Sequence, residues 1–193
     1  MKALAIYAGP QAKQHLALHG LSASDVRVIP AAAGGPKGLI LGPLDRFMFN
    51  EWLTNSQHSI DLVGASIGAW RMATACLPES RAGLLRLEHD YIHQHYELKP
   101  GEKFPSAQQI SESFRENLDL FYGGLVEPLL SHPRFRLHVL TSRGKGLLHR
   151  EHPILSPLGY GGAFLSNLIS RKAMSASLER VVFSSAGALP FGT

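Results

Sequence analysis

The first eighty residues alternate between short apolar runs and segments with helical periodicity. Three apolar runs are each followed by small or turn-forming residues: 3–8, 26–33 and 60–63. Three segments then repeat apolar residues every three or four positions, as a helix packed on one face does: 11–19, 39–53 and 69–77. Repeated strand–turn–helix units predict a parallel β-sheet, whose strands read as unbroken apolar runs because both of their faces are buried.

The second half of the chain predicts longer helices, two further strands and one loop-rich stretch. Helical patterns cover 81–98 and 107–120, and a short helix is expected at 163–172. Strands are expected at 135–141 and 181–185, and the many Pro and Gly residues of 142–162 predict a loop. We therefore expect residues 1–193 to form a single α/β domain with a mostly parallel sheet and helices on both faces.

Composition and charge narrow the class of protein. Hydrophobic residues make up 45% and charged residues 18% of the 193 residues, which is typical of a folded domain and not of a disordered chain. The single cysteine, Cys76, excludes an internal disulfide and a cysteine-based zinc cluster. The net charge of +4 with scattered basic residues favours contact with an anionic membrane over nucleic-acid binding. No apolar run is long enough to span a bilayer, so we expect a cytoplasmic protein, peripheral to membranes if it contacts them.

The first candidate motif is Gly64-Ala65-Ser66-Ile67-Gly68, which fits G-x-S-x-G between a predicted strand and a predicted helix. A sharp strand-to-helix turn pushes the serine hydroxyl outward, and the glycines remove side chains that would collide there. The N–H of Ile67 would then point to where an oxyanion forms, at a helix N-terminus that favours negative charge. The pattern predicts that Ser66 is a nucleophile; the alternative is a plain turn of small residues.

The second candidate motif is Gly34-Gly35-Pro36-Lys37-Gly38, again between a strand and a helix. Consecutive glycines allow backbone N–H groups to converge on an anion. The motif is not a Walker loop, because Gly38 and not Ser or Thr follows Lys37. The open alternatives are an oxyanion hole, a phosphate-binding loop and a plain turn. Because the carboxyl ends of parallel strands share one edge of a sheet, we expect both motifs to lie close together.

Three short stretches, AGGPKG, GASIGA and FSSAGALPF, resemble the patatin-like phospholipases. The resemblance implies a three-layer α/β/α fold that hydrolyses lipid acyl esters with a Ser–Asp dyad and needs no metal or cofactor. It implies that Ser66 is the nucleophile, that Gly34 and Gly35 line the oxyanion hole, and that Lys37 lies beside it. The remaining motif glycines, Gly38, Gly64 and Gly68, belong to the same two turns.

The sequence departs from the family pattern at three points. Ala33 takes the first place of the usual glycine run, and Pro36 has no N–H to donate. The family's catalytic aspartate lies in an Asp-Gly-Gly or Asp-Gly-Ala motif, and no Asp of this chain is followed by Gly. We therefore expect these residues to be the N-terminal part of a longer protein and to be inactive by themselves.

Histidines provide the main alternatives for a proton acceptor. His132, His138, His149 and His152 follow Ser66 in the order of a Ser–His–acid esterase, and Asp90 or Asp119 could also serve. His89 and His93 have the i,i+4 spacing of a metal pair, but an exposed helix face explains them better. A third reading is a non-catalytic domain that binds acyl chains or a partner. The apolar stretch 118–130 is a candidate lid or acyl pocket.

Overall fold

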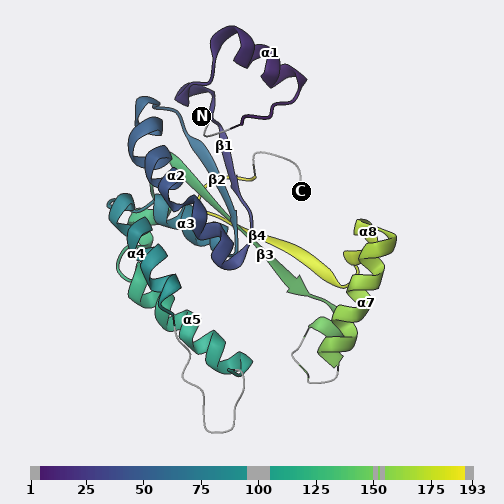
Figure 1. The fold of residues 1–193 in the computed structure, drawn as a ribbon. Helices are drawn as coiled ribbons and strands as arrows, with labels where there is room; N and C mark the ends of the chain where they lie inside the picture. Colours follow the sequence, from purple (N-terminus) through teal and green to yellow (C-terminus); the bar gives the residue numbers. More distant parts are fainter. Residues whose placement is uncertain (1–4, 95–104, 150–151, 153–154, 190–193) are drawn as a thin grey trace.

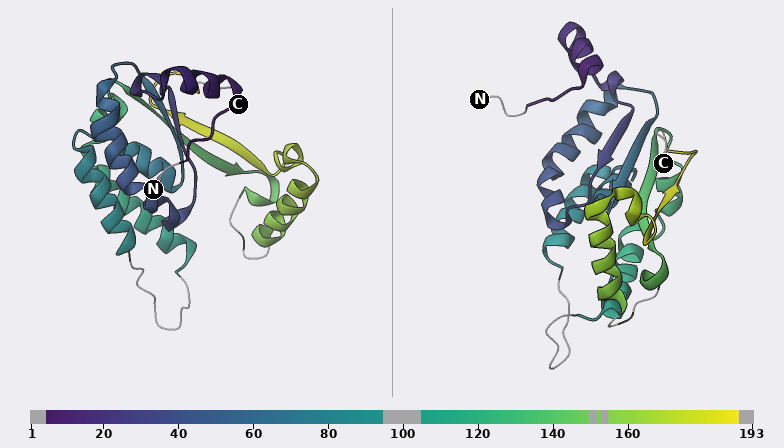
Figure 2. Two further views of the ribbon diagram at one scale, coloured as in Figure 1. Left: turned by 45° about the horizontal axis from the view of Figure 1, so that its top comes forward. Right: turned by 90° about the vertical axis from the view of Figure 1, so that its right-hand side faces the viewer.

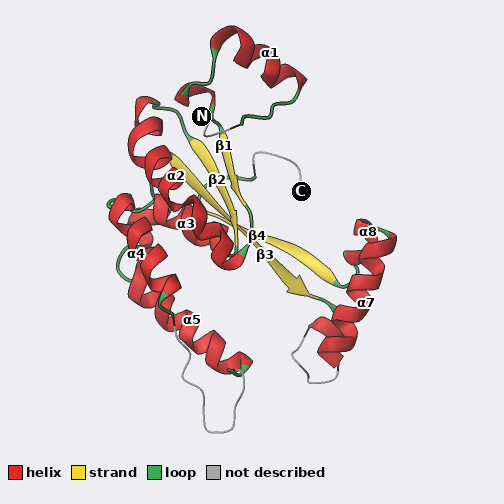
Figure 3. Cartoon of the chain, in the orientation of Figure 1, coloured by secondary structure: helices red, strands yellow, loops and turns green. Residues whose placement is uncertain are grey.

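Four strands form one sheet in the computed structural model, which describes residues 5–94, 105–149, 152 and 155–189 (Figures 1 and 3). The strands are β1 (Val28–Ala31), β2 (Ile60–Ala65), β3 (Phe135–Gly144) and β4 (Leu178–Ser184). The helices are α1 (Pro10–His19), α2 (Gly42–Phe47), α3 (Ile67–Ala75), α4 (Ser80–Ile92), α5 (Ala107–Tyr122), α6 (Val126–Leu130), α7 (Leu155–Ile169) and α8 (Arg171–Met174).

The sheet is mostly parallel, which confirms the α/β class. Its order is β1-β2-β3-β4; β1 and β3 both run parallel to β2, and β4 runs antiparallel to β3. The parallel pairs are joined through helical crossovers, as such pairs require. Both predicted glycine turns therefore follow neighbouring parallel strands and lie at the same edge of the sheet.

One face of the sheet builds the hydrophobic core. Ile60 and Leu62 of β2 pair with Phe135 and Leu137 of β3, and all four side chains are buried on this face. Helix α3 packs along β2 and also contacts β1 and β3, while α4 packs on α3 and α2. A bidentate ion pair fixes α2 to α3: Arg71 donates to both carboxylate oxygens of Asp45, at 2.6 and 2.7 Å.

The other face of the sheet holds a buried polar chain across three strands. His138 of β3 is fully buried, and its Nε2 donates to Asp61 Oδ1 of β2 at 2.9 Å. The hydroxyl of Ser184 in β4 donates to His138 Nδ1 at 2.8 Å, and Arg136 donates to the second oxygen of Asp61 at 2.8 Å. This network satisfies groups that would be costly to bury alone, and it ties β2, β3 and β4 together.

Of two predicted elements near the N-terminus, the strand 3–8 was wrong, and the helix 39–53 was confirmed as helical but is not one regular α-helix. The described part of the predicted strand 3–8 pairs with no other strand, and Ile6 and Tyr7 are largely exposed. An apolar run becomes a strand only where a neighbour accepts its backbone hydrogen bonds. The predicted helix 39–53 is divided into a 3₁₀ segment (Gly35–Leu41), α2 and a π-helical turn (Met48–Trp52). Pro43 at the start of α2 lacks the N–H that a continuous helix needs.

The predicted loop 142–162 was wrong over its last part, because α7 already begins at Leu155. Gly159 allows a close approach: a side chain there would lie 2.7 Å from Leu148 Cδ2. Gly159, which contributed to the prediction of a loop, is thus used for packing within a helix.

Strands β3 and β4 continue past the end of β2 and carry a separate arm, residues 141–181. Leu140 pairs with Ala65, the last residue of β2, and residues 141–144 pair with β4 alone. The arm holds α7, α8 and a 3₁₀ turn (Gly146–Leu148), and it projects away from the body of the fold (Figure 2). Among the described residues, no helix combines the length and apolarity that crossing a bilayer requires.

Candidate functional site

Ser66 occupies the turn between β2 and α3 in an unusual backbone conformation. Its φ is 53° and its ψ is −128°, and it is the only described residue other than glycine with a positive φ. Such a conformation is strained for a residue with a side chain and persists only when its surroundings enforce it. Ser66 is exposed and caps the N-terminus of α3. The hydroxyl therefore lies at a helix end where negative charge is stabilised.

Close backbone contacts require glycine at both ends of the G-x-S-x-G motif, Gly64 and Gly68. A side chain at Gly64 would lie 2.5 Å from the Cα of Ala69 in α3. A side chain at Gly68 would overlap the carbonyl oxygen of Ala31 at the end of β1. Helix α3 can thus leave the turn at Ser66 and pass directly over β1 only because both positions lack a Cβ.

The second glycine motif lies next to the first. Gly35 has a φ of +54°, which favours glycine, and Pro36 and Lys37 open the 3₁₀ segment Gly35–Leu41. A side chain at Gly38 would lie 2.7 Å from Ile67 Cγ2, so the segment packs against the residue that follows Ser66. Lys37 is exposed. The structure therefore brings both motifs together at one sheet edge, as the spacing predicted.

The N–H groups of the proposed oxyanion hole come from these two turns. Ile67 is the first residue of α3, so its N–H has no acceptor within the helix. Gly34 is the N-cap and Gly35 the first residue of the 3₁₀ segment that touches Ile67. Backbone N–H groups at two neighbouring helical N-termini are the kind of donor that can bind a developing oxyanion.

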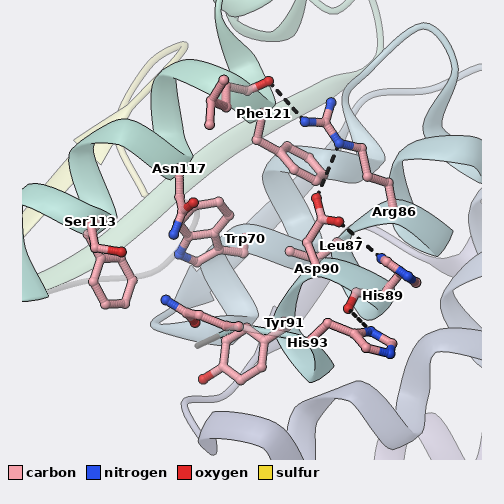
Figure 4. Close-up of a pocket in the computed structure, with 13 residues that line it drawn as sticks. Trp70, Arg86, Leu87, His89, Asp90, Tyr91, His93, Ser113, Asn117 and Phe121 are labelled. Carbon is pink, nitrogen blue, oxygen red and sulfur yellow. Dashed lines mark hydrogen bonds and ion pairs between the residues drawn. The ribbon is translucent and has the colours of Figure 1, made fainter. Parts of the chain in front are cut away.

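A pocket of about 330 Å³ lies between α3, α4 and α5, next to this site (Figure 4). Trp70, Phe114 and Phe121 form its aromatic wall, and Asp90 and His89 lie at its polar side. Trp70 follows Ser66 by one helical turn, and its N–H donates to Ser66 O at 3.3 Å.

Tyr91 joins the pocket to the glycine motif. It lines the pocket, and its hydroxyl lies 4.0 Å from where a side chain at Gly35 would begin. The pocket is therefore lined by Trp70, one helical turn after Ser66 in α3, and by Tyr91, whose hydroxyl lies near Gly35.

Buried contacts hold the pocket wall in place. The Tyr122 hydroxyl of α5 donates to Trp70 O at 3.1 Å and lies 3.0 Å from Thr74 Oγ1. Burial raises the pKa of Tyr122, so its hydroxyl stays protonated and keeps donating. On the rim, the Arg86 guanidinium stacks 4.8 Å above the Phe121 ring and donates to Asp90 at 3.2 Å. Helix α5 is thus fixed to both α3 and α4.

No carboxylate or imidazole of the described residues is hydrogen-bonded to the Ser66 hydroxyl. His138 has both ring nitrogens engaged by Asp61 and Ser184. His138 pairs with Val63, three residues before Ser66 on β2, which at about 3.3 Å per residue is roughly 10 Å along the strand. In this structure both of its ring nitrogens therefore serve the polar network of the sheet and not the Ser66 hydroxyl.

The remaining histidines and aspartates occupy other places. His132 Nδ1 accepts the N–H of Phe135 at 2.9 Å, at the start of β3 and so at the edge opposite Ser66. His149 and His152 lie in the arm, and His152 Nδ1 accepts the N–H of Leu155. Asp119 is exposed on α5.

His89 and His93 stack with ring centroids 4.2 Å apart on the exposed side of α4. His93 Nδ1 also donates to His89 O at 2.8 Å, and His89 Nδ1 lies 3.2 Å from Asp90. Within the described ranges, no group of three or more His, Cys, Asp or Glu side chains is placed to bind a metal ion.

No family model, curated protein or solved structure matches this chain.

Two features of the site were not predicted from the sequence. Trp70 could have been found, since a residue four positions after Ser66 shares its side of a helix. No sequence pattern around Tyr91 marked it as part of the site, because only the packing of α4 brings it to Gly35. The link from Asp61 to His138 and Ser184 depends on strand register, although the alternation around Arg136 and His138 does place those two on one face.

Proposed function

We propose that this protein hydrolyses acyl esters of lipids through an acyl-enzyme on Ser66. The observation that carries the proposal is the backbone of Ser66, a non-glycine residue with a φ of 53° at the N-terminus of α3. Strain of this kind clusters at functional sites, because a merely structural turn would be more stable with glycine. The resemblance to patatin-like hydrolases supports the same residue and implies a three-layer α/β/α architecture.

The chemistry follows from the groups at the sheet edge. Ser66 Oγ attacks the ester carbonyl carbon, and the carbonyl oxygen takes the negative charge. The N–H groups of Ile67, Gly34 and Gly35 bind that oxyanion; a single such donor is worth about 3 kcal/mol in comparable sites. The bond from carbonyl carbon to alcohol oxygen then breaks, and the alcohol leaves with the serine proton, carried by a general base. Water hydrolyses the acyl-enzyme and restores Ser66.

The pocket between α3, α4 and α5 is the proposed acyl-chain site. It begins one helical turn from Ser66, and its wall of Trp70, Phe114 and Phe121 offers apolar contact to an alkyl chain. Each methylene that moves from water into such a site contributes about 0.8 kcal/mol, close to a fourfold gain in kcat/KM. The site therefore favours long acyl chains over short ones.

Ester hydrolysis by the full-length protein tests the proposal. We expect Ser66→Ala to reduce hydrolysis of p-nitrophenyl butanoate by more than ~100-fold. Ser59→Ala, a matched change at a second exposed serine, should retain the wild-type rate. Full activity in Ser66→Ala would remove Ser66 from the mechanism. An inactive wild-type protein that still binds dodecanoate would favour the non-catalytic acyl-binding reading.

A chain-length series tests the acyl pocket. Asn117 lines the pocket on α5, and Glu116 beside it is exposed and does not. Asn117→Phe would fill the pocket and should lower the ratio of dodecanoate to butanoate hydrolysis at least ~10-fold. Glu116→Phe should leave that ratio unchanged. An unchanged ratio in Asn117→Phe would place the acyl chain elsewhere.

A further inference from the structure

Helix α7 presents large apolar side chains to solvent along its whole length. Seven of its 15 residues are large, apolar or aromatic, and exposed; we call them the α7 face: Leu155, Leu158, Tyr160, Phe164, Leu165, Leu168 and Ile169. At about 100° per residue they cover more than half of the helix circumference. A helix of a folded domain normally turns such residues toward the core, and a contiguous apolar surface outside it marks an interaction site.

The arm uses the small residues of α7 for its own packing. Gly159 and Ala163 are buried, and Gly159 lies against Leu148 of the 3₁₀ turn. In the structure, α7 packs on that turn and on α8. The large residues of the α7 face therefore take little part in the packing of the arm and are exposed to solvent.

The charge around the α7 face is strongly asymmetric. Helix α7 contains no charged residue, and Arg171 and Lys172 follow it after Ser170. Residues 141–181, the arm, hold six of the chain's 19 Lys and Arg residues and only two of its 15 Asp and Glu residues. Six minus two gives +4, which equals the net charge of the whole chain. The rest of the sequence is thus electrically balanced, and the excess positive charge lies in the arm.

The arm leaves the sheet at the edge that carries Ser66. Ala65, which precedes Ser66, pairs with Leu140, and β3 then continues beyond the end of β2 into the arm (Figure 1). The arm and the candidate site therefore lie toward the same end of the sheet.

We propose that the α7 face docks on the surface of an anionic lipid bilayer. Binding in the membrane interface scales with the apolar area that is buried there and with electrostatic attraction to anionic lipids, and the α7 face offers the first while the basic residues of the arm offer the second. Cations near an anionic leaflet each contribute about 1 kcal/mol, so the excess charge of the arm acts in the same direction. A second copy of the chain would instead bring two arms of the same net charge, +4 each, against one another, and like charges repel. The role that we assign to this docking, bringing Ser66 to a lipid substrate, rests on the proposed function.

Flotation with vesicles tests the docking in the full-length protein. We expect binding to vesicles of phosphatidylcholine mixed with phosphatidylglycerol, weaker binding to phosphatidylcholine alone, and loss of binding as salt is raised. The double variant Leu165→Glu/Ile169→Glu should lose at least ~10-fold in binding. Lys172→Gln should bind the mixed vesicles roughly fivefold more weakly than the wild type.

Two control variants separate docking from folding and from charge. Leu18→Glu/Leu85→Glu changes the net charge equally at exposed leucines of α1 and α4, and it should float as the wild type does. Leu165→Phe/Ile169→Phe keeps the face apolar and should bind at least as well as the wild type. Equal flotation of the Leu165→Glu/Ile169→Glu variant and the wild type would overturn the proposal.

The same preparations distinguish the docking from the hydrolase proposal. Ser66→Ala should float as the wild type does, and soluble p-nitrophenyl butanoate reports on Ser66 without a membrane. Flotation without ester hydrolysis would overturn the proposed function and leave the docking in place. A wild-type protein that does not float, and that sediments as a dimer which Leu165→Glu/Ile169→Glu converts to monomers, would show that the α7 face pairs with a second copy, and would overturn the docking.

Discussion

Gly68 of α3 lies directly against the carbonyl oxygen of Ala31, the last residue of β1. The contact brings the helix that begins after Ser66 onto the strand that leads into Gly34 and Gly35. The two motifs are thus coupled by backbone packing and not by a side-chain interaction. Any side chain at position 68 would have to separate them.

Gly68→Ala should therefore destabilise the fold and disturb the site together. The added methyl group meets backbone atoms of Ala31 and Ala32, which cannot move without shifting the end of β1. We expect a loss of about 2–3 kcal/mol in the free energy of unfolding, measured by urea denaturation. Gly161→Ala, in α7 with no atom within 4 Å of the added Cβ, should be neutral or stabilising by up to about 1 kcal/mol. Similar losses in both variants would contradict the close contact.

Ser66→Gly should be more stable than Ser66→Ala. Both changes remove the hydroxyl, but only glycine adopts a φ of 53° without strain. The expected difference in the free energy of unfolding is about 1 kcal/mol. Neither variant should hydrolyse esters. If Ser66→Ala proved the more stable of the two, the turn would not be strained.

His138→Ala should be strongly destabilising without involving Ser66. The change leaves the buried carboxylate of Asp61 without its imidazole donor and opens a cavity in the sheet. We expect a loss of about 3 kcal/mol or more. His149→Ala, at an exposed position, should change stability by less than about 0.5 kcal/mol. A stable His138→Ala protein that loses only its esterase activity would support His138 as the base.

The stability of the fold should decrease below pH 6.5 in part because of His132. Burial, and then the positive charge of Arg134, lowers the pKa of His132 from 6.5. The unfolded chain thus binds a proton at a higher pH than the folded chain. The stabilisation is complete above 6.5 and is lost as the pH falls through the folded-state pKa.

His132→Asn is the variant that isolates this effect. Its side-chain oxygen can accept the N–H groups of Arg134 and Phe135, which His132 Nδ1 accepts now, but it does not titrate. Urea denaturation on both sides of pH 6.5 should show a smaller loss in the variant than in the wild type. Identical losses would assign the acid sensitivity to other groups.

Most of the sheet could be predicted from the sequence, because buried parallel strands appear in it as short continuous apolar runs. The apolar runs at β1 and β2 and the alternation in β3 each marked a strand that the structure contains. The run 3–8 has the same composition but finds no partner strand, and composition alone does not encode pairing. Gly159 of α7 contributed to the prediction of a loop because its role, close packing on Leu148, is set by residues outside the helix.

Only the parts of the candidate site that are close in sequence, the two glycine motifs, could be predicted. The G-x-S-x-G spacing placed Ser66 on a strand-to-helix turn, and the second glycine turn was expected beside it. Tyr91 and the pocket wall come from α4 and α5, whose positions depend on tertiary contacts such as Tyr122 with Trp70. The position of His138 far from Ser66 likewise follows from register, which a list of histidines in sequence order does not contain.

Labelling with a fluorophosphonate probe, followed by peptide mapping, tests the central claim most directly. Such a probe forms a covalent bond to an activated serine and needs neither a particular acyl chain nor a membrane. We expect the wild-type protein to be modified at Ser66 and Ser66→Ala to remain unlabelled, while Ser59→Ala is labelled as the wild type is. Absence of labelling, or equal labelling of the wild type and Ser66→Ala, would contradict the claim.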